Sequence, residues 1–236
     1  MQKYFSTIVY LVTVLLLNIC PPVIYAESAP KNCPPNHVIH GTANNFTETF
    51  TQYEEIKKID IMQLSPAAKQ QLLNIIAVYD YCDEKSKVKF IKEFPNTFQK
   101  FLDIFQQKNF SQLYLVSGTC IDVLEFIANE YPERCVDLLV SLSSEAKYEA
   151  DAPGALQYTF TNFFIKNPDL TISKIKQLSL SKQKNIASFL ADVETIKTYS
   201  EYQNILDILK NRNEIKLYKI FAEAKKKQIS DLECNH

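Results

Sequence analysis

The spacing of apolar residues constrains the fold of this chain more than any other feature. Along most of the sequence they recur every three or four residues, as at Phe46, Phe50, Tyr53 and Ile56. This spacing places them on one face of an α-helix. No segment alternates apolar and polar residues with the period of two that a half-buried β-strand requires. The pattern therefore predicts an all-α chain with roughly ten to twelve short helices.

The low glycine content supports this fold class and excludes several kinds of site. The 236 residues include only 3 glycines, whereas tight β-hairpin turns need glycine where φ is positive. Phosphate-binding loops of the GxGxxG or Walker type also depend on glycine. A hydrophobic content of 46% excludes a disordered chain. The formal net charge of −1 argues against a nucleic-acid partner, which would favour a basic excess.

Residues 1–26 have the pattern of a signal peptide. Lys3 gives a basic start, an apolar run covers residues 4–20, and Ala26 suits the last position before cleavage. We therefore expect an exported protein, periplasmic or extracellular, that is cleaved near Ala26. An uncleaved membrane segment is the alternative, although Pro21-Pro22 interrupts the run.

The mature chain is predicted to have two parts. Residues 27–42 are rich in proline, asparagine and small residues, and they indicate an extended N-terminal segment. Residues 43–236 are predicted to form a single all-helical domain. Ser65-Pro66 has the chemistry of a helix start, with that helix running to about Cys82. Ala152-Pro153-Gly154 is the clearest break in the middle of the domain.

Two short patterns recur along the chain. The first is a Leu-Ser pair followed by a helical segment, at residues 64–69, 142–147 and 178–183. The second is a Phe-Ile pair followed by proline, in residues 90–95, 126–132 and 164–168, with successive copies 36 and 38 residues apart. In each copy of the second pattern one apolar helix is predicted to end and another to follow a proline-containing turn.

This organisation resembles the HEAT and armadillo class of α-solenoids over about residues 64–228. The resemblance implies stacked helical hairpins, each of which buries its apolar face against the next. It includes no diagnostic motif, so it assigns no functional residue. An irregular helical bundle is the alternative fold, because both patterns are also ordinary chemistry at helix boundaries.

The function that we expect is that of a non-catalytic binding or scaffold protein that engages a protein partner and needs no cofactor. No GxSxG or HExxH motif occurs, and no catalytic residue is assigned. Two alternatives stay open. One is a small periplasmic or secreted hydrolase or metal-dependent enzyme, and the other is a protein that associates with a membrane surface through its basic C-terminal helix or its uncleaved signal segment.

Charge is segregated along the sequence, and we interpret the charged regions as an interaction surface. The acidic candidates are Glu130, Glu133, Asp137, Glu149 and Asp151. The basic candidates are Lys216, Lys219, Lys225, Lys226 and Lys227. Solvated acidic pairs and lysines that complement a helix C-terminus are the alternative explanations. Surface aromatic residues are also expected, at Tyr79, Tyr81, Tyr158, Tyr199 and Tyr202.

Cysteine usage gives two further hypotheses. In an exported protein most of the five cysteines that follow Ala26 should pair; these disulfide candidates are Cys33, Cys82, Cys120, Cys135 and Cys234. We expect a pair among Cys82, Cys120 and Cys135. If instead the two ends of the chain met, a zinc site could form from Cys33, His37, His40, Cys234 and His236.

Overall fold

The computed structural model describes residues 56–106, 113–147, 151–193, 196 and 199–234. These residues all belong to the second of two structural units, Pro34–His236. They form ten α-helices and one short 3₁₀ helix, and the described part of the chain contains no strand. The all-α prediction is confirmed. The signal peptide, the extended segment and the helix expected around Phe46 lie outside the described residues.

The first three helices begin where capping residues occur in the sequence. They are α3 (Pro66–Tyr81), α4 (Glu84–Glu93) and α5 (Phe98–Phe105). Ser65 Oγ accepts a hydrogen bond from the Ala68 amide (3.2 Å) at the start of α3, as predicted. Asp83 performs the same role for α4 by accepting from the Ser86 amide at 2.7 Å.

Prolines start the helices in the middle of the chain. The 3₁₀ helix η1 (Tyr114–Val116) leads into α6 (Ser117–Glu130), which is followed by α7 (Pro132–Glu145), α8 (Ala152–Lys166) and α9 (Pro168–Lys176). The last three helices carry proline in their first turn, where its fixed φ suits the helix and its missing amide costs no hydrogen bond. The predicted break at Ala152-Pro153-Gly154 is therefore the first turn of α8.

Three helices complete the described chain. They are α10 (Leu180–Ala191), α11 (Ser200–Asn211) and α12 (Ile215–Cys234). Ser179 Oγ accepts from the Lys182 amide at 3.4 Å and caps α10. No described helix is both long and apolar enough to cross a membrane.

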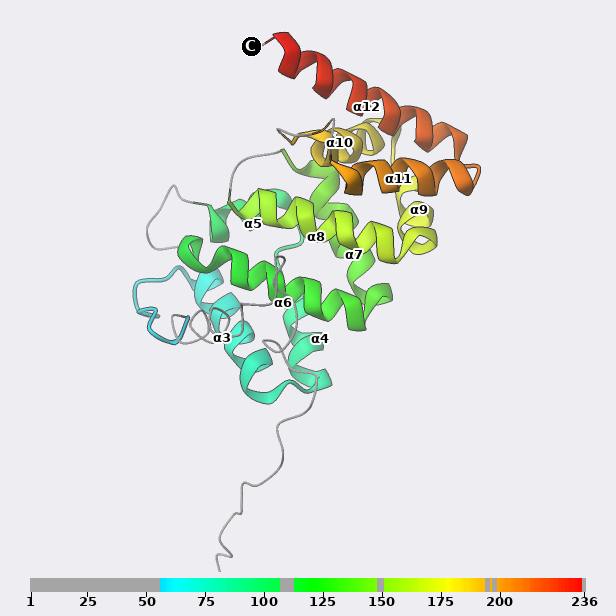
Figure 1. Ribbon diagram of the computed structural model, residues 1–236. Coiled ribbons are helices and arrows are strands. Elements are labelled where there is room, and N and C mark those ends of the chain that lie inside the picture. The colour runs from blue at the N-terminus through cyan, green and yellow to red at the C-terminus, as the bar shows by residue number, and fades with distance from the viewer. Residues whose placement is uncertain (1–55, 107–112, 148–150, 194–195, 197–198, 235–236) are drawn as a thin grey trace, which may run out of the picture. The chain divides into compact units, whose positions relative to one another are not determined.

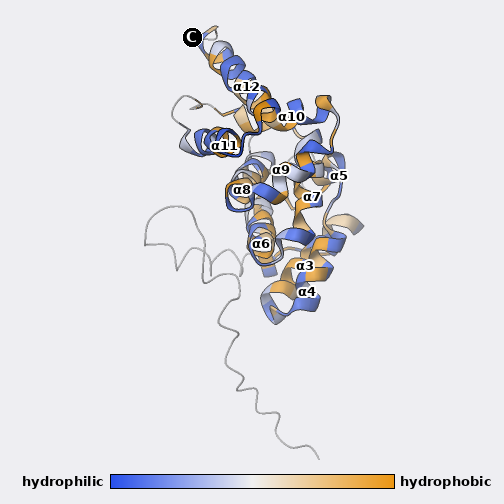
Figure 2. Cartoon of the chain, turned by 90° about the vertical axis from the view of Figure 1, so that its right-hand side faces the viewer, coloured by the Kyte–Doolittle hydropathy of each residue, from blue (hydrophilic) through white to orange (hydrophobic). Residues whose placement is uncertain are grey.

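The helices pack in a regular order of neighbours. In one row α4 contacts α6, α6 contacts α8, and α8 contacts α11. In a second row α5 contacts α7, α7 contacts α9 and α10, and α10 contacts α12. Figure 1 shows this succession from α3 and α4 through α6 and α8 to α11 and α12. Apolar and polar stretches alternate along the helices (Figure 2), as expected for amphipathic helices packed on one another.

One apolar core runs through all of these helices. Aromatic rings concentrate at two places in it. Near α4 and α5 the ring centroids of Phe94 and Phe105 lie 5.9 Å apart. Near the C-terminal helices, Phe221 of α12 lies 6.0 Å from Phe164 of α8 and 6.1 Å from Tyr202 of α11. Phe221 therefore ties the last helix to the middle of the domain.

The two recurring patterns have different structural meanings. The Phe-Ile pairs lie at or near the C-terminal ends of α4, α6 and α8, and a proline follows each helix end, as predicted. The Leu-Ser pairs are not equivalent to one another. Ser65 and Ser179 cap helices, but Ser143 lies inside α7 and is fully buried, so this copy of the pattern does not mark a helix start.

Candidate functional site

Most of the predicted acidic surface is used to join helices. Glu130 forms an ion pair with Lys87 of α4 at 2.7 Å, and Asp137 pairs with Lys174 of α9 at 2.7 Å. Asp151 accepts a hydrogen bond from the Tyr114 hydroxyl at 3.0 Å. Glu133 is exposed, and Glu149 lies outside the described residues. The acidic candidates therefore do not form one open patch.

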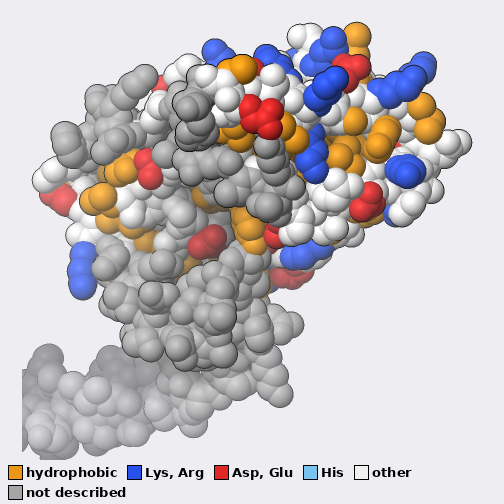
Figure 3. Space-filling view, turned by 45° about the horizontal axis from the view of Figure 1, so that its top comes forward, with side chains coloured by type: hydrophobic (Ala, Val, Ile, Leu, Met, Phe, Trp, Pro, Cys, Tyr) orange, Lys and Arg blue, Asp and Glu red, His pale blue; other side chains and the backbone are white. Residues whose placement is uncertain are grey.

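The basic candidates remain accessible on the last helix. Lys216, Lys219, Lys226 and Lys227 are exposed on α12, and none of the four forms an ion pair with another described residue. Lys225 Nζ donates to Gln203 Oε1 at 2.9 Å. Figure 3 shows lysine and arginine side chains spread over the side of the molecule where the C-terminal helices lie.

The position of these lysines removes one explanation for them. A helix macrodipole favours cations only within the last turn. Because α12 continues to Cys234, Lys225, Lys226 and Lys227 lie in its middle, and its last turn contains no basic residue. Complementing the dipole therefore does not account for this basic group.

An acidic and aromatic group lies on α6 and α8. Glu125 is almost fully buried, and its Oε1 accepts from Asn162 Nδ2 of α8 at 3.1 Å. Desolvation by the surrounding protein, together with the negative charge of Glu125, raises the pKa of Asp122 from 3.8 to about 6. Tyr158 lies close enough to both carboxylates for them to raise its pKa, although burial is the larger cause.

The predicted surface tyrosines divide into three kinds. Tyr81 is exposed, and Tyr79, Tyr158 and Tyr199 are half-buried. Tyr202 is fully buried, so the prediction for it is wrong. Its hydroxyl donates to the carbonyl oxygen of Phe221 at 2.9 Å. The sequence does indicate that Tyr202 is buried, because its helical spacing places it on the same face as Ile205, Leu206 and Leu209.

The disulfide expected among Cys82, Cys120 and Cys135 does not form, and no disulfide joins two described residues. Cys120 and Cys135 are free and fully buried. Cys120 lies near the start of α6 and Cys135 near the start of α7, so almost the whole of α6 separates them. At 1.5 Å per residue this is about 15 Å, whereas a disulfide needs Cα atoms within about 7 Å.

The proposed metal ligands cannot be assembled from the described residues. Cys234 is free and exposed at the end of α12, while Cys33, His37, His40 and His236 lie outside the described residues, as does the Cys33 disulfide candidate. Among the side chains that the structure describes, no group of three or more His, Cys, Asp or Glu is arranged to hold a metal ion.

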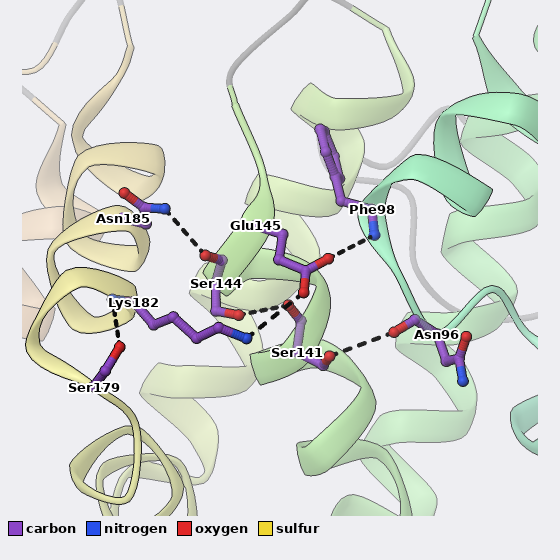
Figure 4. Close-up of polar contacts among 8 residues, drawn as sticks. All are labelled: Asn96, Phe98, Ser141, Ser144, Glu145, Ser179, Lys182 and Asn185. Carbon is purple, nitrogen blue, oxygen red and sulfur yellow. Dashed lines mark hydrogen bonds and ion pairs between the residues drawn. The ribbon is translucent and has the colours of Figure 1, made fainter.

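A polar network joins α5, α7 and α10 (Figure 4). Glu145 lies between the other two helices: its Oε2 accepts from the Phe98 amide at 3.4 Å, and its Oε1 is 3.6 Å from Lys182 Nζ. Asn185 Nδ2 donates to the Ser144 carbonyl at 3.3 Å, and Ser141 Oγ donates to the Asn96 carbonyl at 3.4 Å. These contacts hold the end of α7 against the starts of two helices, so we interpret the network as structural.

A pocket of about 560 Å³ lies between the N-terminal end of α3, the α4–α5 connection and α5. Its wall carries both signs of charge, from Lys92, Glu93, Lys100 and Asp103. Gln71 also lines it and is 2% exposed. No sequence motif marks this pocket, because its residues come from three separate segments.

A second pocket of about 420 Å³ lies between α9 and the α11–α12 connection. Its charged side chains bind each other. Arg212 forms two hydrogen bonds to the Asp169 carboxylate, at 2.6 and 3.2 Å, and Lys176 pairs with Glu214 at 2.9 Å. This pocket is therefore a junction between helices whose charges are already neutralised.

No family model, curated protein or solved structure matches this chain.

Proposed function

We propose that this chain is an exported, non-catalytic binding or scaffold protein that engages a protein partner. We further propose that its helices form an α-solenoid-like array of stacked hairpins. Three contacts between neighbouring helices support the second proposal, because the two residues of each contact are the same distance apart in the sequence. Glu125 and Asn162, Asn129 and Lys166, and Asp137 and Lys174 are each 37 residues apart.

Such a constant distance is expected when one hairpin is repeated and stacked on the next. Two of these contacts join α6 to α8 and the third joins α7 to α9, so two successive pairs of helices share one offset. The regularity changes in the C-terminal part, where two short helices, α9 and α10, both contact α7. This insertion separates α8 from its next neighbour in the same row, α11, by more than one repeat length.

The observation that carries the binding proposal is the basic group on α12, formed by Lys216, Lys219, Lys226 and Lys227. Several basic side chains of the earlier helices pair with carboxylates on neighbouring helices, as Lys174 does with Asp137. The α12 lysines face outward from the last described helix and have no such partner among the described residues. Glu223 lies on the same helix four residues from Lys219 and from Lys227, so the group carries an excess of positive charge over one carboxylate. Such an excess steers and orients an oppositely charged partner.

The test compares two variants with the same change in net charge. The full chain, produced with its own signal segment, is cross-linked in the compartment to which it is exported, and the captured partner is purified. Binding of the purified partner is then measured for the wild type, for Lys226→Glu with Lys227→Glu, and for the control Lys85→Glu with Lys89→Glu on α4. Lys85 and Lys89 are likewise exposed.

We expect the α12 variant to bind at least tenfold more weakly than the wild type, and the α4 variant to bind like the wild type. Added salt should weaken wild-type binding, because surface electrostatics are screened. Equal binding by all three proteins would overturn the assignment to α12. Failure to reconstitute any complex, with salt-sensitive binding to vesicles containing anionic phospholipid instead, would replace the protein partner with a membrane surface.

A further inference from the structure

The pocket beside α3 contains two kinds of polar group that lack a hydrogen-bond partner. The first is an amide at the start of a helix, which favours an anion. The first amides of a helix have no acceptor within it. In α3, Pro66 has no amide hydrogen, and Ser65 Oγ accepts from the Ala68 amide. The amide of Ala67, a pocket residue, is left at the positive end of the helix dipole.

Two lysines stand on the same pocket wall. Lys92 and Lys100 are exposed and form no ion pair with a described residue; Lys100 Nζ donates to Asn96 Oδ1 at 3.2 Å. Together with the Ala67 amide they provide three donors for a carboxylate. Glu93 and Asp103 on the same rim offset the charge of the two lysines, so a singly charged carboxylate fits this pocket better than a doubly charged phosphate, which they repel twice as strongly.

The second kind of unsatisfied group is a buried acceptor. Gln71 Nε2 donates to the Glu93 carbonyl, but Gln71 Oε1 is buried and has no hydrogen-bond partner. A buried polar atom that is left unpaired is destabilising, so this oxygen marks a place where a donor is missing. Because Gln71 lines the pocket, a ligand N–H bound there supplies the missing donor.

The pocket also has an apolar floor, from Phe94 and Ile104, which are 3% and 5% exposed. A carboxylate, an adjacent N–H donor and an apolar side chain occur together at the C-terminal end of a peptide. Recognition of such an end by main-chain amides is a known mode of peptide binding. The volume of about 560 Å³ lies within the range of roughly 300–1,000 Å³ that is usual for small-ligand sites.

We propose that this pocket binds the C-terminal end of a partner polypeptide. The terminal carboxylate lies at the start of α3 between Lys92 and Lys100, the last peptide N–H donates to Gln71 Oε1, and the last side chain rests on Phe94 and Ile104. The proposal rests on the binding function proposed above and names the part of the partner that is recognised.

The experiment titrates the isotopically labelled mature protein with the peptide acetyl-Ala-Ala-Ala-Leu and follows the amide signals of Ala67 and Gln71 by NMR. The free-acid peptide is compared with the same peptide carrying a C-terminal amide. We expect saturable shifts of both signals with the acid, and at least tenfold weaker binding of the amide.

Variants assign the binding to the pocket. Lys92→Gln with Lys100→Gln should weaken binding of the acid at least tenfold, whereas the control Lys85→Gln with Lys89→Gln should not change it. Gln71→Met keeps the length of the side chain and removes the amide, so it should weaken binding of the acid. If that variant does not fold, the lysine variants still decide the question.

Equal binding of the acid and the amide, absence of shifts at Ala67 and Gln71, or binding unaffected by the lysine changes would overturn the proposal. These results are distinguishable from a failure of the proposed function. If the partner still binds through α12 while the peptide does not bind, only the peptide site is wrong. If neither binds, both proposals are wrong.

Discussion

Asp122 illustrates, at the scale of a single residue, how packing changes the chemistry of a side chain. The sequence places it in a run of acidic residues, where each carboxylate has the same expected behaviour. In the folded protein, desolvation and the charge of Glu125 raise the pKa of Asp122 from 3.8 to about 6. The side chain stays exposed to solvent, and solvent screening weakens the effect of the shift on stability.

The shift predicts a pH dependence of stability with a definite sign. Between pH 3.8 and about 6, the folded state binds more protons at Asp122 than the unfolded state does, so stability from this group falls as pH rises through that window. Asp122→Asn should remove this contribution and make the protein relatively more stable above pH 6. Urea unfolding across pH 4 to 7 measures it, with Asp207→Asn on α11 as the control. A steeper fall in the variant than in the wild type would contradict the prediction.

The burial of two cysteines predicts that the thiols of the protein differ in their rates of alkylation. Burial raises the pKa of Cys135 to about 12, and it also raises the pKa of Cys120; because the thiolate is the reactive form, both should resist alkylation in the folded protein. Exposed Cys234 should react first. Mass spectrometry after iodoacetamide treatment, with and without denaturant, checks this order. Labelling of Cys120 as fast as Cys234 under native conditions would show that the α6 environment is open.

At the scale of single helices, capping residues connect the sequence to the structure. Ser179 precedes α10 and its hydroxyl accepts from the Lys182 amide. The same Leu-Ser pattern at Ser143 does not start a helix, since Ser143 is buried within α7. A serine that caps and a serine inside a helix have similar local sequences, and the packing of the surrounding residues decides between them.

The cap of α10 predicts a measurable loss of stability. Ser179→Ala should lower the free energy of unfolding by about 1 kcal/mol, because one amide of the first turn loses its acceptor. Ser179→Asp keeps an acceptor at the same place and should stay close to the wild type. Urea denaturation of the three proteins checks this. A loss in the Asp variant equal to that in the Ala variant would mean that the cap does not stabilise α10.

At the scale of the whole molecule, Phe221 connects the C-terminal helix to the middle of the domain. Its ring is fully buried and lies beside Phe164 and Tyr202, and its carbonyl accepts from the Tyr202 hydroxyl. A helix in a stacked array is stabilised mainly by its neighbour. Loss of this contact should therefore affect α12 more than the helices at the other end.

Phe221→Ala should lower the free energy of unfolding by roughly 3–5 kcal/mol, because it removes a buried ring and leaves a cavity. Hydrogen exchange followed by mass spectrometry should show that the substitution accelerates exchange, relative to the wild type, more in α11 and α12 than in α3 and α4. Ile220→Ala, a change at a partly buried neighbour, is the control and should cost less. Uniform acceleration across all helices would indicate a single cooperative core instead of stacked units.

Local features of the sequence were sufficient to predict the all-α class and the positions of several helix boundaries. Ser65-Pro66, the start of α9 at Pro168 and the apolar face of α11 follow from capping, proline chemistry and helical spacing, which act over a few residues. The pocket beside α3 was not predictable in this way. Gln71, Lys92 and Lys100 come from three helices, and nothing in their local sequence distinguishes them from other polar residues.

The sequence by itself determined that the described chain is helical and where many of its helices begin, because these properties depend on contacts within one or two turns. Only the tertiary structure decided which charges pair and which stay open. It joined Glu130 to Lys87 and Asp137 to Lys174 while leaving four lysines of α12 exposed. It also left the side-chain oxygen of Gln71, Oε1, without a hydrogen-bond partner in the wall of a pocket. The physical reason is that hydrogen bonds and ion pairs act over a few ångströms in space. Lys87 and Glu130, which are 43 positions apart in the sequence, therefore meet only after their helices have packed.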